Sequence, residues 1–187
     1  MKHKLNSINT KQMLVDALIA LSSQKPFSKI TVSEIVDYCN INRKTFYYHF
    51  TDIYDLLEYY LNSEISLAIS TFDPIKDINA TTTYAFDYMN QHAYLKNFLQ
   101  DTLARDKVTQ LLNKAIYPKT LELIQVLEHT HRKNLEDDFK LFLANSFTRI
   151  IVLSLLDSIE NPNNYDVEKI QEYISTLFQM SMQGVYQ

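Results

Sequence analysis

Basic, hydroxyl and aromatic side chains gather in one short stretch of this chain, residues 31–50, with the sequence TVSEIVDYCNINRKTFYYHF. The stretch holds guanidinium, ammonium, imidazole, phenol and hydroxyl groups and only two carboxylates. Such groups donate hydrogen bonds to phosphate oxygens and to the edges of bases. The chemistry that they suit is therefore recognition of nucleic acid rather than catalysis.

The order of residues in this stretch predicts two short helices joined by a tight turn. Thr31 and Glu34 have the spacing of a capping box, which starts the first helix. Asn40 lies in the turn, because Asn tolerates left-handed backbone angles better than most residues other than Gly. Asn42 then caps the second helix. Two helices in this order form a helix-turn-helix, which places its second helix in the major groove of DNA.

Charge is divided unevenly along the chain. Residues 1–50 carry seven Lys or Arg and three acids, a net charge of +4, while the remaining residues carry eleven and nineteen, a net charge of −8. The overall net charge of −4 argues against nucleic-acid binding. Phosphate attraction is local, however, and is screened within about 10 Å at 0.1 M salt, so the positive N-terminal part suits DNA. Without the motif, the same charges would be interpreted as solvating each surface.

Residues 30–61 resemble the DNA-binding head of the tetracycline-repressor (TetR/AcrR) family, over the sequence ITVSEIVDYCNINRKTFYYHFTDIYDLLEYYL. Within that family, the NTKQ opening and the YYHFTDIYDLL segment are similar to the branch that includes regulators of dihydroxyacetone kinase operons. The resemblance implies an all-α fold of about nine helices, in which a three-helix helix-turn-helix head precedes a helical bundle body. Two positions depart from the family's pattern. Asn40 stands where the turn usually has Gly, and Ile53 stands where a phosphate-binding Lys is usual, which removes one expected DNA contact.

The resemblance also implies which residues contact DNA. Arg43 and Lys44 open the second helix and are the best readers of base edges, since Arg pairs bidentately with guanine. Lys11, on the preceding helix, is a further candidate for contact with the DNA backbone. For Tyr47 and Tyr48, packing against neighbouring helices is the alternative. The predicted DNA-binding residues come from the two motif helices and are Thr31, Ser33, Asn42, Arg43, Lys44, Thr45, Tyr47, Tyr48 and His49.

The other members of this set are expected at the sugar–phosphate backbone. Thr31 and Ser33 open the first motif helix, where hydroxyls and free amide groups suit a phosphate. Tyr47 and His49 anchor phosphates, and Thr45 contacts a thymine methyl group or a phosphate.

Apolar periodicity and the positions of Pro predict how the chain is organised. Residues 1–52 form the DNA-binding domain, a connecting helix covers 51–70, and residues 71–187 form a helical ligand-binding and dimerisation domain. Residues 1–8 are expected to be a loose tail and 72–79 a linker. Pro118 bends or divides its helix. Outside the motif, the expected helices cover residues 9–23, 51–70, 81–99, 105–128, 136–160 and 167–182.

The last two helices, about 136–160 and 166–184, each carry an apolar stripe, and a short polar turn joins them. They are therefore expected to pack antiparallel. The resemblance implies that this pair meets its copy across a two-fold axis, so that the two heads of a homodimer match the two half-sites of a palindromic operator. An internal bundle with no partner is the alternative.

Several classes of protein are disfavoured. A single Gly excludes Gly-rich phosphate-binding loops. His129 and His131 are two residues apart, so on a helix they cannot form an i, i+4 metal pair. We therefore predict no enzyme, no metal and no cofactor. The one cysteine, Cys39, cannot form an internal disulfide, suits a reducing cytoplasm and is expected to be buried. The longest apolar run, 150–156, is too short to cross a membrane.

These inferences together predict a DNA-binding transcriptional regulator, most simply a ligand-responsive repressor. Aromatic residues between 81 and 128 are numerous enough to enclose a small-molecule effector, but an aromatic stripe is more often core than pocket. We therefore name no ligand-binding residues. The alternative is a transcriptional co-activator whose body docks a metabolite-sensing partner protein.

Overall fold

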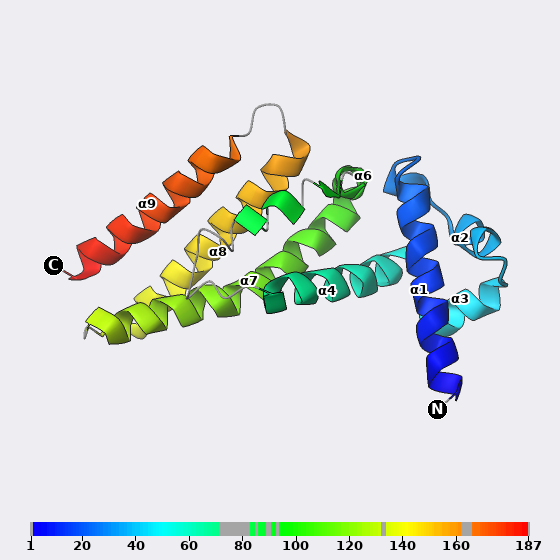
Figure 1. The fold of residues 1–187 in the computed structure, drawn as a ribbon, viewed down its shortest axis with the longest axis horizontal. Coiled ribbons are helices and arrows are strands. Elements are labelled where there is room, and N and C mark those ends of the chain that lie inside the picture. Colours follow the sequence, from blue (N-terminus) through cyan, green and yellow to red (C-terminus); the bar gives the residue numbers. More distant parts are fainter. Residues whose placement is uncertain are drawn as a thin grey trace. The chain divides into compact units, whose positions relative to one another are not determined.

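Helices make up all the regular structure in the part of the chain that the structure describes. The computed structural model describes residues 2–71, 83–84, 86–88, 91–92, 94–131, 134–161 and 166–186. The helices drawn in Figure 1 are α1 (Lys2–Ser22), the 3-10 helix η1 (Phe27–Lys29), α2 (Val32–Tyr38), α3 (Arg43–His49), α4 (Ile53–Thr71), α6 (Leu95–Leu99), α7 (Thr102–His131), α8 (Asp137–Glu160) and α9 (Val167–Tyr186). The predicted all-α fold class is confirmed.

These helices form two compact units. Unit 1 consists of Met1–Glu64 and Ala93–Val108, and unit 2 of Ile65–His92 and Thr109–Gln187. Helices α4 and α7 each begin in unit 1 and continue into unit 2. The predicted motif lies wholly within unit 1.

The core of unit 1 forms where α1, α2 and α3 pack on one another. Leu14 and Leu18 on α1 are fully buried, as are Ile35 on α2 and Phe46 on α3. Burying a side chain of this size stabilises the fold by about 1.5–3 kcal/mol. The buried face of α1 is therefore the face that supports the motif.

Residues 93–108 complete unit 1 from a distant part of the sequence. The Phe98 ring of α6 meets the Phe27 ring of η1 edge-on, with centroids 5.4 Å apart, and both side chains are fully buried. Hydrogen bonds and an ion pair add to this contact. The pairs are Ser22–Asn97, Tyr54–Asp101, Glu58–Lys107 and Tyr60–Tyr94. The end of α1 and the start of α4 are thus held against α6 and the start of α7.

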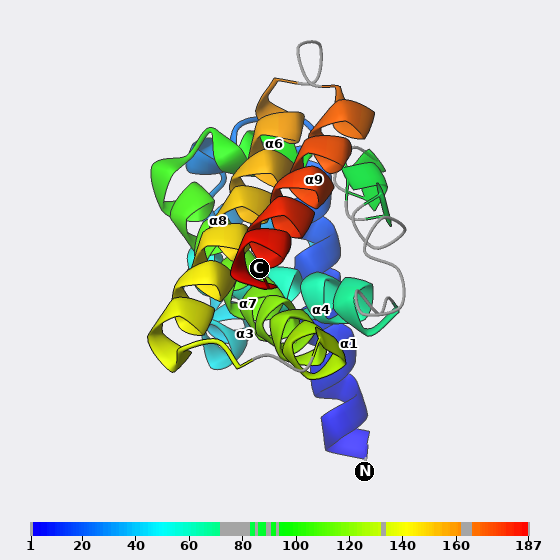
Figure 2. The ribbon, with the colours of Figure 1, turned by 90° about the vertical axis from the view of Figure 1, so that its left-hand side faces the viewer.

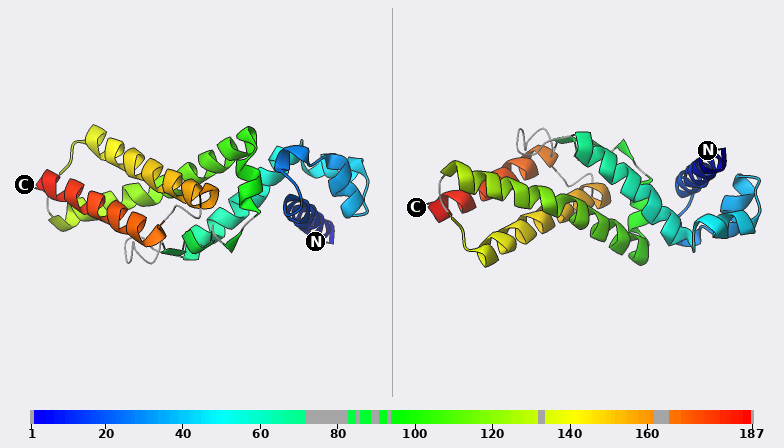
Figure 3. Two further views of the ribbon diagram at one scale, coloured as in Figure 1. Left: turned by 90° about the horizontal axis from the view of Figure 1, so that it is seen from above. Right: turned by 90° about the horizontal axis from the view of Figure 1, so that it is seen from below.

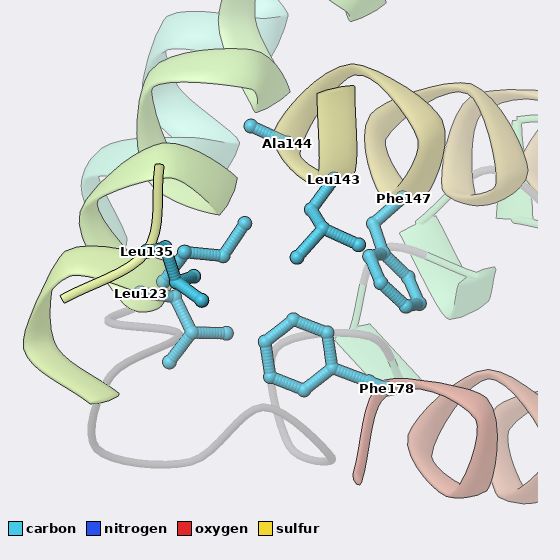
Figure 4. Close-up of a cluster of buried hydrophobic side chains, with 7 residues drawn as sticks. Leu123, Leu135, Leu143, Ala144, Phe147 and Phe178 are labelled. Atoms are coloured by element: carbon cyan, nitrogen blue, oxygen red, sulfur yellow. The ribbon is translucent and has the colours of Figure 1, made fainter. Parts of the chain in front are cut away.

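Helices α8 and α9 lie side by side and antiparallel in unit 2, as Figures 2 and 3 show. Phe147 on α8 and Phe178 on α9 meet edge-on, with ring centroids 4.8 Å apart. The predicted antiparallel packing of the last two helices is confirmed. These two rings belong to a buried cluster drawn in Figure 4, which consists of Leu123, Ile124, Leu135, Leu143, Ala144, Phe147 and Phe178.

The connection between α7 and α8 is held by one carboxylate, that of Glu128. It accepts a hydrogen bond from the backbone amide of Leu135 at 2.7 Å and forms an ion pair with Lys140 at 2.8 Å. Glu128 is 9% exposed, so its charge is compensated by these two partners rather than by water. Leu135 is thereby fixed where its side chain joins the cluster of Figure 4.

Helix α1 begins earlier than predicted. The expected loose tail over residues 1–8 is wrong, because α1 is helical from Lys2. Residues 2–8 contain neither Gly nor Pro, so nothing in their backbone opposes extension of the helix.

Helix α7 runs from Thr102 to His131 with Pro118 inside it, so of the two predicted outcomes at Pro118, a bend or a division, the division does not occur. Pro removes one backbone hydrogen bond and favours a kink, but packing on both sides of it, at Leu112 and Ile124, keeps one helix. The predicted linker at 72–79 lies outside the described residues.

By length and mean hydropathy, α8 alone among the described helices could cross a membrane. Its residues Leu143, Phe147, Val152 and Leu155 are instead buried within the protein. A core helix has the same composition.

Candidate nucleic-acid interface

Helix α2 starts with the predicted capping box. The Thr31 amide and hydroxyl both donate to the Glu34 carboxylate at 2.9 Å, and the Glu34 amide donates to the Thr31 hydroxyl oxygen at 3.3 Å. Lys25 donates to the same carboxylate. These hydrogen bonds, that of Lys25 first, lower the pKa of the Glu34 carboxyl below its ordinary value. The start of the first motif helix is therefore fixed from two sides.

Asn40 makes the turn between the two motif helices. It has a φ of 52°, the one positive φ of a residue other than Gly among the described residues. Asn tolerates this conformation better than a residue with a branched side chain does. The prediction that Asn40 makes the turn is therefore confirmed. The neighbouring Cys39 is half-buried rather than fully buried, and its thiol donates to the backbone oxygen of Met13 on α1 at 3.2 Å. Burial raises the pKa of the Cys39 thiol. The turn is thereby tied to α1.

The second motif helix, α3, begins at the predicted cap. The Asn42 side-chain oxygen accepts the Thr45 amide at 2.8 Å and the Thr45 hydroxyl at 3.1 Å. The side-chain oxygen of Asn42 and the hydroxyl of Thr45 are thus hydrogen-bonded to each other. Contact of either residue with DNA is a prediction that the structure does not test.

Helix α3 separates its buried and exposed side chains as the sequence pattern predicts. Phe46 is buried against the helices beneath, and Phe50, directly after α3, is buried as well. Tyr47 and Tyr48 are 57% and 75% exposed, so neither is used mainly for packing. Arg43 and Lys44 are exposed at the start of the helix. The exposed face of α3 is therefore rich in the donors that bases and phosphates accept.

Arg43 is linked across the motif to the first helix. Its guanidinium Nη2 donates a hydrogen bond to the Ser33 hydroxyl on α2. The two residues were predicted to have separate roles, one at a base and one at a phosphate. The structure brings them together and leaves the other guanidinium donors of Arg43 available.

Lys11 and His49 both lie near one aromatic ring, that of Phe50. The Lys11 ammonium lies 4.5 Å from the ring centroid of Tyr59 on α4 and 5.4 Å from that of Phe50. His49, the last residue of α3, has its ring against those of Tyr48 and Phe50. Desolvation first and the charge of Lys11 second lower the pKa of His49. Sequence reasoning treated these two cations separately, because the contact joins helices that are far apart in the chain.

The cap of α4 is Asp52, and not the neighbouring Thr51, although both are residue types that cap helices. One Asp52 carboxylate oxygen accepts the amides of Tyr54 and Asp55, both at 2.8 Å. The Thr51 amide and hydroxyl instead donate to the Asp55 carboxylate. Ile53 is the first residue of α4, so the helix offers no cation at its start.

The aromatic residues considered for an effector pocket divide between the two units. Phe98 packs against Phe27 in the core of unit 1, and Phe86 of unit 2 is buried. In unit 2, the ring of Tyr88 lies 4.2 Å from that of His92, whose Nδ1 is 2.6 Å from the Tyr88 backbone oxygen. Over the described ranges, no group of three His, Cys, Asp or Glu side chains is placed to hold a metal ion.

One protein-family model matches the part of the chain that contains this motif. The family model of "Bacterial regulatory proteins, tetR family" matches residues 14–60, which cover the end of α1 through the first part of α4. The match therefore covers the capped motif and its supporting helices. No curated protein sequence matches the chain.

Solved structures share the fold of the whole chain. "Dihydroxyacetone kinase operon activator DhaS" aligns at 17% identity over 95% of this chain and 98% of that one, with a TM-score of 0.71. A putative transcriptional regulator from Pseudomonas aeruginosa PAO1 aligns at 12% identity over 94% of this chain and 91% of that one, with a TM-score of 0.70. At these identities the likeness is one of fold.

Proposed function

We propose that this chain is a DNA-binding transcriptional regulator of the TetR family and acts as a homodimeric, ligand-responsive repressor that binds a palindromic operator in the cytoplasm. The observation that carries the proposal is the exposed face of α3, which presents Arg43, Lys44 and Tyr48 in a motif whose two helices each start at a side-chain cap. In the proposed arrangement, residues 1–52 read DNA, and residues 71–187 bind the effector and dimerise.

The proposed DNA contacts are those assigned from the sequence. Arg43 and Lys44 read base edges, Thr31 and Ser33 lie near a phosphate, and Asn42, Thr45, Tyr47, Tyr48 and His49 line the remaining contact. A helix of this kind enters the major groove, and two heads related by two-fold symmetry reach half-sites separated by about 34–36 Å or a multiple of it.

Exposed apolar side chains on α8 and α9 support the proposed homodimer. Phe142 and Leu153 on α8 and Tyr173, Leu177 and Met180 on α9 are each at least 50% exposed. The three on α9 have the spacing of one helix face. Phe147 and Phe178 already bury another face of the same two helices. A second copy packing on the exposed face would complete a four-helix bundle.

The dimer is tested by placing a charge on this face. Leu177→Lys is expected to convert the protein to a monomer in sedimentation experiments and to abolish cooperative binding to a two-site duplex. The matched control is Gln179→Lys, which adds the same charge at an exposed polar position of α9. A wild-type chain that sediments as a monomer at micromolar concentration would exclude the homodimer.

Regulation by a ligand is tested together with DNA binding. The protein would be used to select duplexes from a random pool, and metabolites that raise its melting temperature would then be added to the selected duplex. A repressor of the proposed kind releases DNA when its ligand binds, because the ligand favours one conformation over the other by about 1–3 kcal/mol. A wild-type protein that selects no sequence from the pool would refute the DNA-binding proposal.

The second candidate function is a co-activator whose body docks a metabolite-sensing protein. One observation favours it: Phe139 and Phe142 stack on each other at the start of α8, and both are exposed together with Leu141. The structurally similar DhaS is described as an operon activator. A purified protein that changes its DNA affinity on binding a metabolite alone would exclude this candidate.

A further inference from the structure

The aromatic rings beside the last turn of α3 hold a lysine whose charge no acid of the described structure neutralises. The Lys11 ammonium lies over the faces of two rings, Tyr59 at 4.5 Å and Phe50 at 5.4 Å. Both distances are within the range of about 6 Å in which the quadrupole of a ring attracts a cation. Within the described residues, Lys11 forms no ion pair with a carboxylate.

A second ionisable base lies next to this lysine. The ring of His49 is 6.4 Å from that of Phe50, one of the two rings over which Lys11 lies. The pKa of His49 is lowered by desolvation first and then by the charge of Lys11, whose field opposes protonation of the imidazole. The rings of Tyr48 and Phe50 also lie against His49. Two groups that repel one another when charged are thus held together at the end of α3.

An anion between the two groups would relieve this repulsion. Ring faces attract the Lys11 ammonium through its charge and offer no oxygen or nitrogen acceptor to its three N–H donors. A phosphate oxygen accepts such donors and favours the protonated form of a neighbouring imidazole. The adjoining helix cannot supply the cation, since α4 contains no Lys, Arg or His between Ile53 and Thr71.

We propose that Lys11 and His49 together bind one phosphate of the DNA backbone, so that α1, and not α4, provides the main cation beside the end of α3. The inference rests on the proposed DNA-binding function and adds a site to it. The rings of Phe50 and Tyr59 act as its support, because they fix the Lys11 ammonium without neutralising it.

The salt dependence of DNA binding tests this site. Affinity of the wild-type protein and of Lys11→Met would be measured against salt concentration on a duplex selected by the wild type and on an unrelated duplex of equal length. Losing one phosphate contact lowers the slope of log K against log salt by about 0.9. We expect this reduction on both duplexes, with the base preference unchanged, and recovery of the slope in Lys11→Arg. The matched control is Lys96→Met, which removes one exposed charge from α6 in the same unit and is expected to keep the wild-type slope.

The titration of His49, followed by NMR, gives a second readout that folding alone would not change. In free Lys11→Met the pKa of His49 rises, since a repelling charge has been removed. In the wild type, DNA raises the pKa of His49, and the same concentration of inorganic phosphate does not. An equal rise with inorganic phosphate would show a site for free anions and would overturn the proposal.

The outcomes separate the site from the function on which it rests. A protein that selects a sequence but whose slope is the same in Lys11→Met and Lys96→Met retains the proposed function and loses this site. A protein that selects no sequence loses the proposed function, while the slope on the unrelated duplex still decides whether Lys11 binds a phosphate. A protein that binds no duplex overturns both.

Discussion

The guanidinium of Arg43 on α3 donates a hydrogen bond to the hydroxyl of Ser33 on α2, so one side chain of each motif helix is joined directly to the other. The bond uses one donor of a group that has five, and the remainder still present a fork of donors to a base edge. Ser33 therefore limits the directions in which Arg43 can point before DNA arrives.

Replacing Arg43 with Ala is expected to weaken specific DNA binding by about 1–3 kcal/mol and to relax preference at one base position. Ser33→Ala should relax preference at the same position, because the freed Arg43 side chain must then be ordered on binding. In the double variant the two losses of base preference should not add, since each substitution removes the same Arg43–Ser33 hydrogen bond. Base preference would be measured by competition among duplexes that differ at single positions. Specific affinity equal to that of the wild type in Arg43→Ala would contradict its assignment as a reader.

The capping box of α2 predicts a loss of stability when Thr31 is changed. Thr31→Ala removes the hydroxyl that accepts the Glu34 amide, and loss of such a cap costs about 0.5–2 kcal/mol. Thr31→Ser keeps the hydroxyl and should retain most of the stability. Urea denaturation followed by circular dichroism measures both, and equal midpoints for Ala and Ser would exclude the cap as the cause.

Glu34 predicts how stability changes in acid. Its pKa is lower in the folded protein than in the unfolded chain, chiefly through the Lys25 hydrogen bond, so its contribution is complete above the unfolded pKa and is lost as pH falls through the folded pKa. Glu34→Gln should therefore narrow the difference in melting temperature between neutral and acidic buffer. Melting curves from pH 7 to pH 3 test this. Asp37→Asn, which removes an exposed acid from the same helix, is the control and should change the pH dependence less.

The left-handed backbone of Asn40 predicts different effects of two small substitutions on the free energy of unfolding. Asn40→Ala places a Cβ in this conformation without a side chain that can offset it, at a cost of about 1 kcal/mol. Asn40→Gly meets no steric penalty at this φ and should be close to neutral. Free energies of unfolding from chemical denaturation distinguish the two, and an Ala variant as stable as the Gly variant would contradict the argument.

The carboxylate of Glu128 predicts a local effect at the α7–α8 connection. Glu128→Ala leaves the Leu135 amide without its acceptor, and an unpaired amide of this kind costs about 1–3 kcal/mol. Glu128→Gln keeps an acceptor oxygen and should cost less. Hydrogen exchange at the Leu135 amide reports the change directly: exchange should accelerate strongly in the Ala variant and only slightly in the Gln variant.

Local chemistry in the motif could be predicted from the sequence because each feature depends on neighbouring residues. The Thr31–Glu34 box, the turn at Asn40 and the Asn42 cap all join residues at most three positions apart, and the structure confirms each of them. The cap of α4 could not be assigned in this way, since Thr51 and Asp52 are both good caps and only the geometry decides between them.

Contacts between distant residues could not be predicted in the same way. The position of Lys11 over Tyr59 depends on how α1 crosses α4, and the contact of Phe27 with Phe98 joins segments separated by most of unit 1 and part of unit 2. Neither contact leaves a periodic signal in the sequence. The DNA contacts assigned to individual residues stay predictions until DNA binding is measured.

The contact of Phe27 with Phe98 also bears on how chimeras of this protein can be built. Because unit 1 is assembled from residues 1–64 and 93–108, a chimera that joins only the first segment to a foreign body would uncover the Phe27 ring and leave Tyr54 and Glu58 without their partners Asp101 and Lys107. The smallest part of this protein that could be transferred with its motif intact is therefore discontinuous in sequence. Exchange of specificity between relatives must carry α6 and the start of α7 along with the motif, or replace both sides of that contact together.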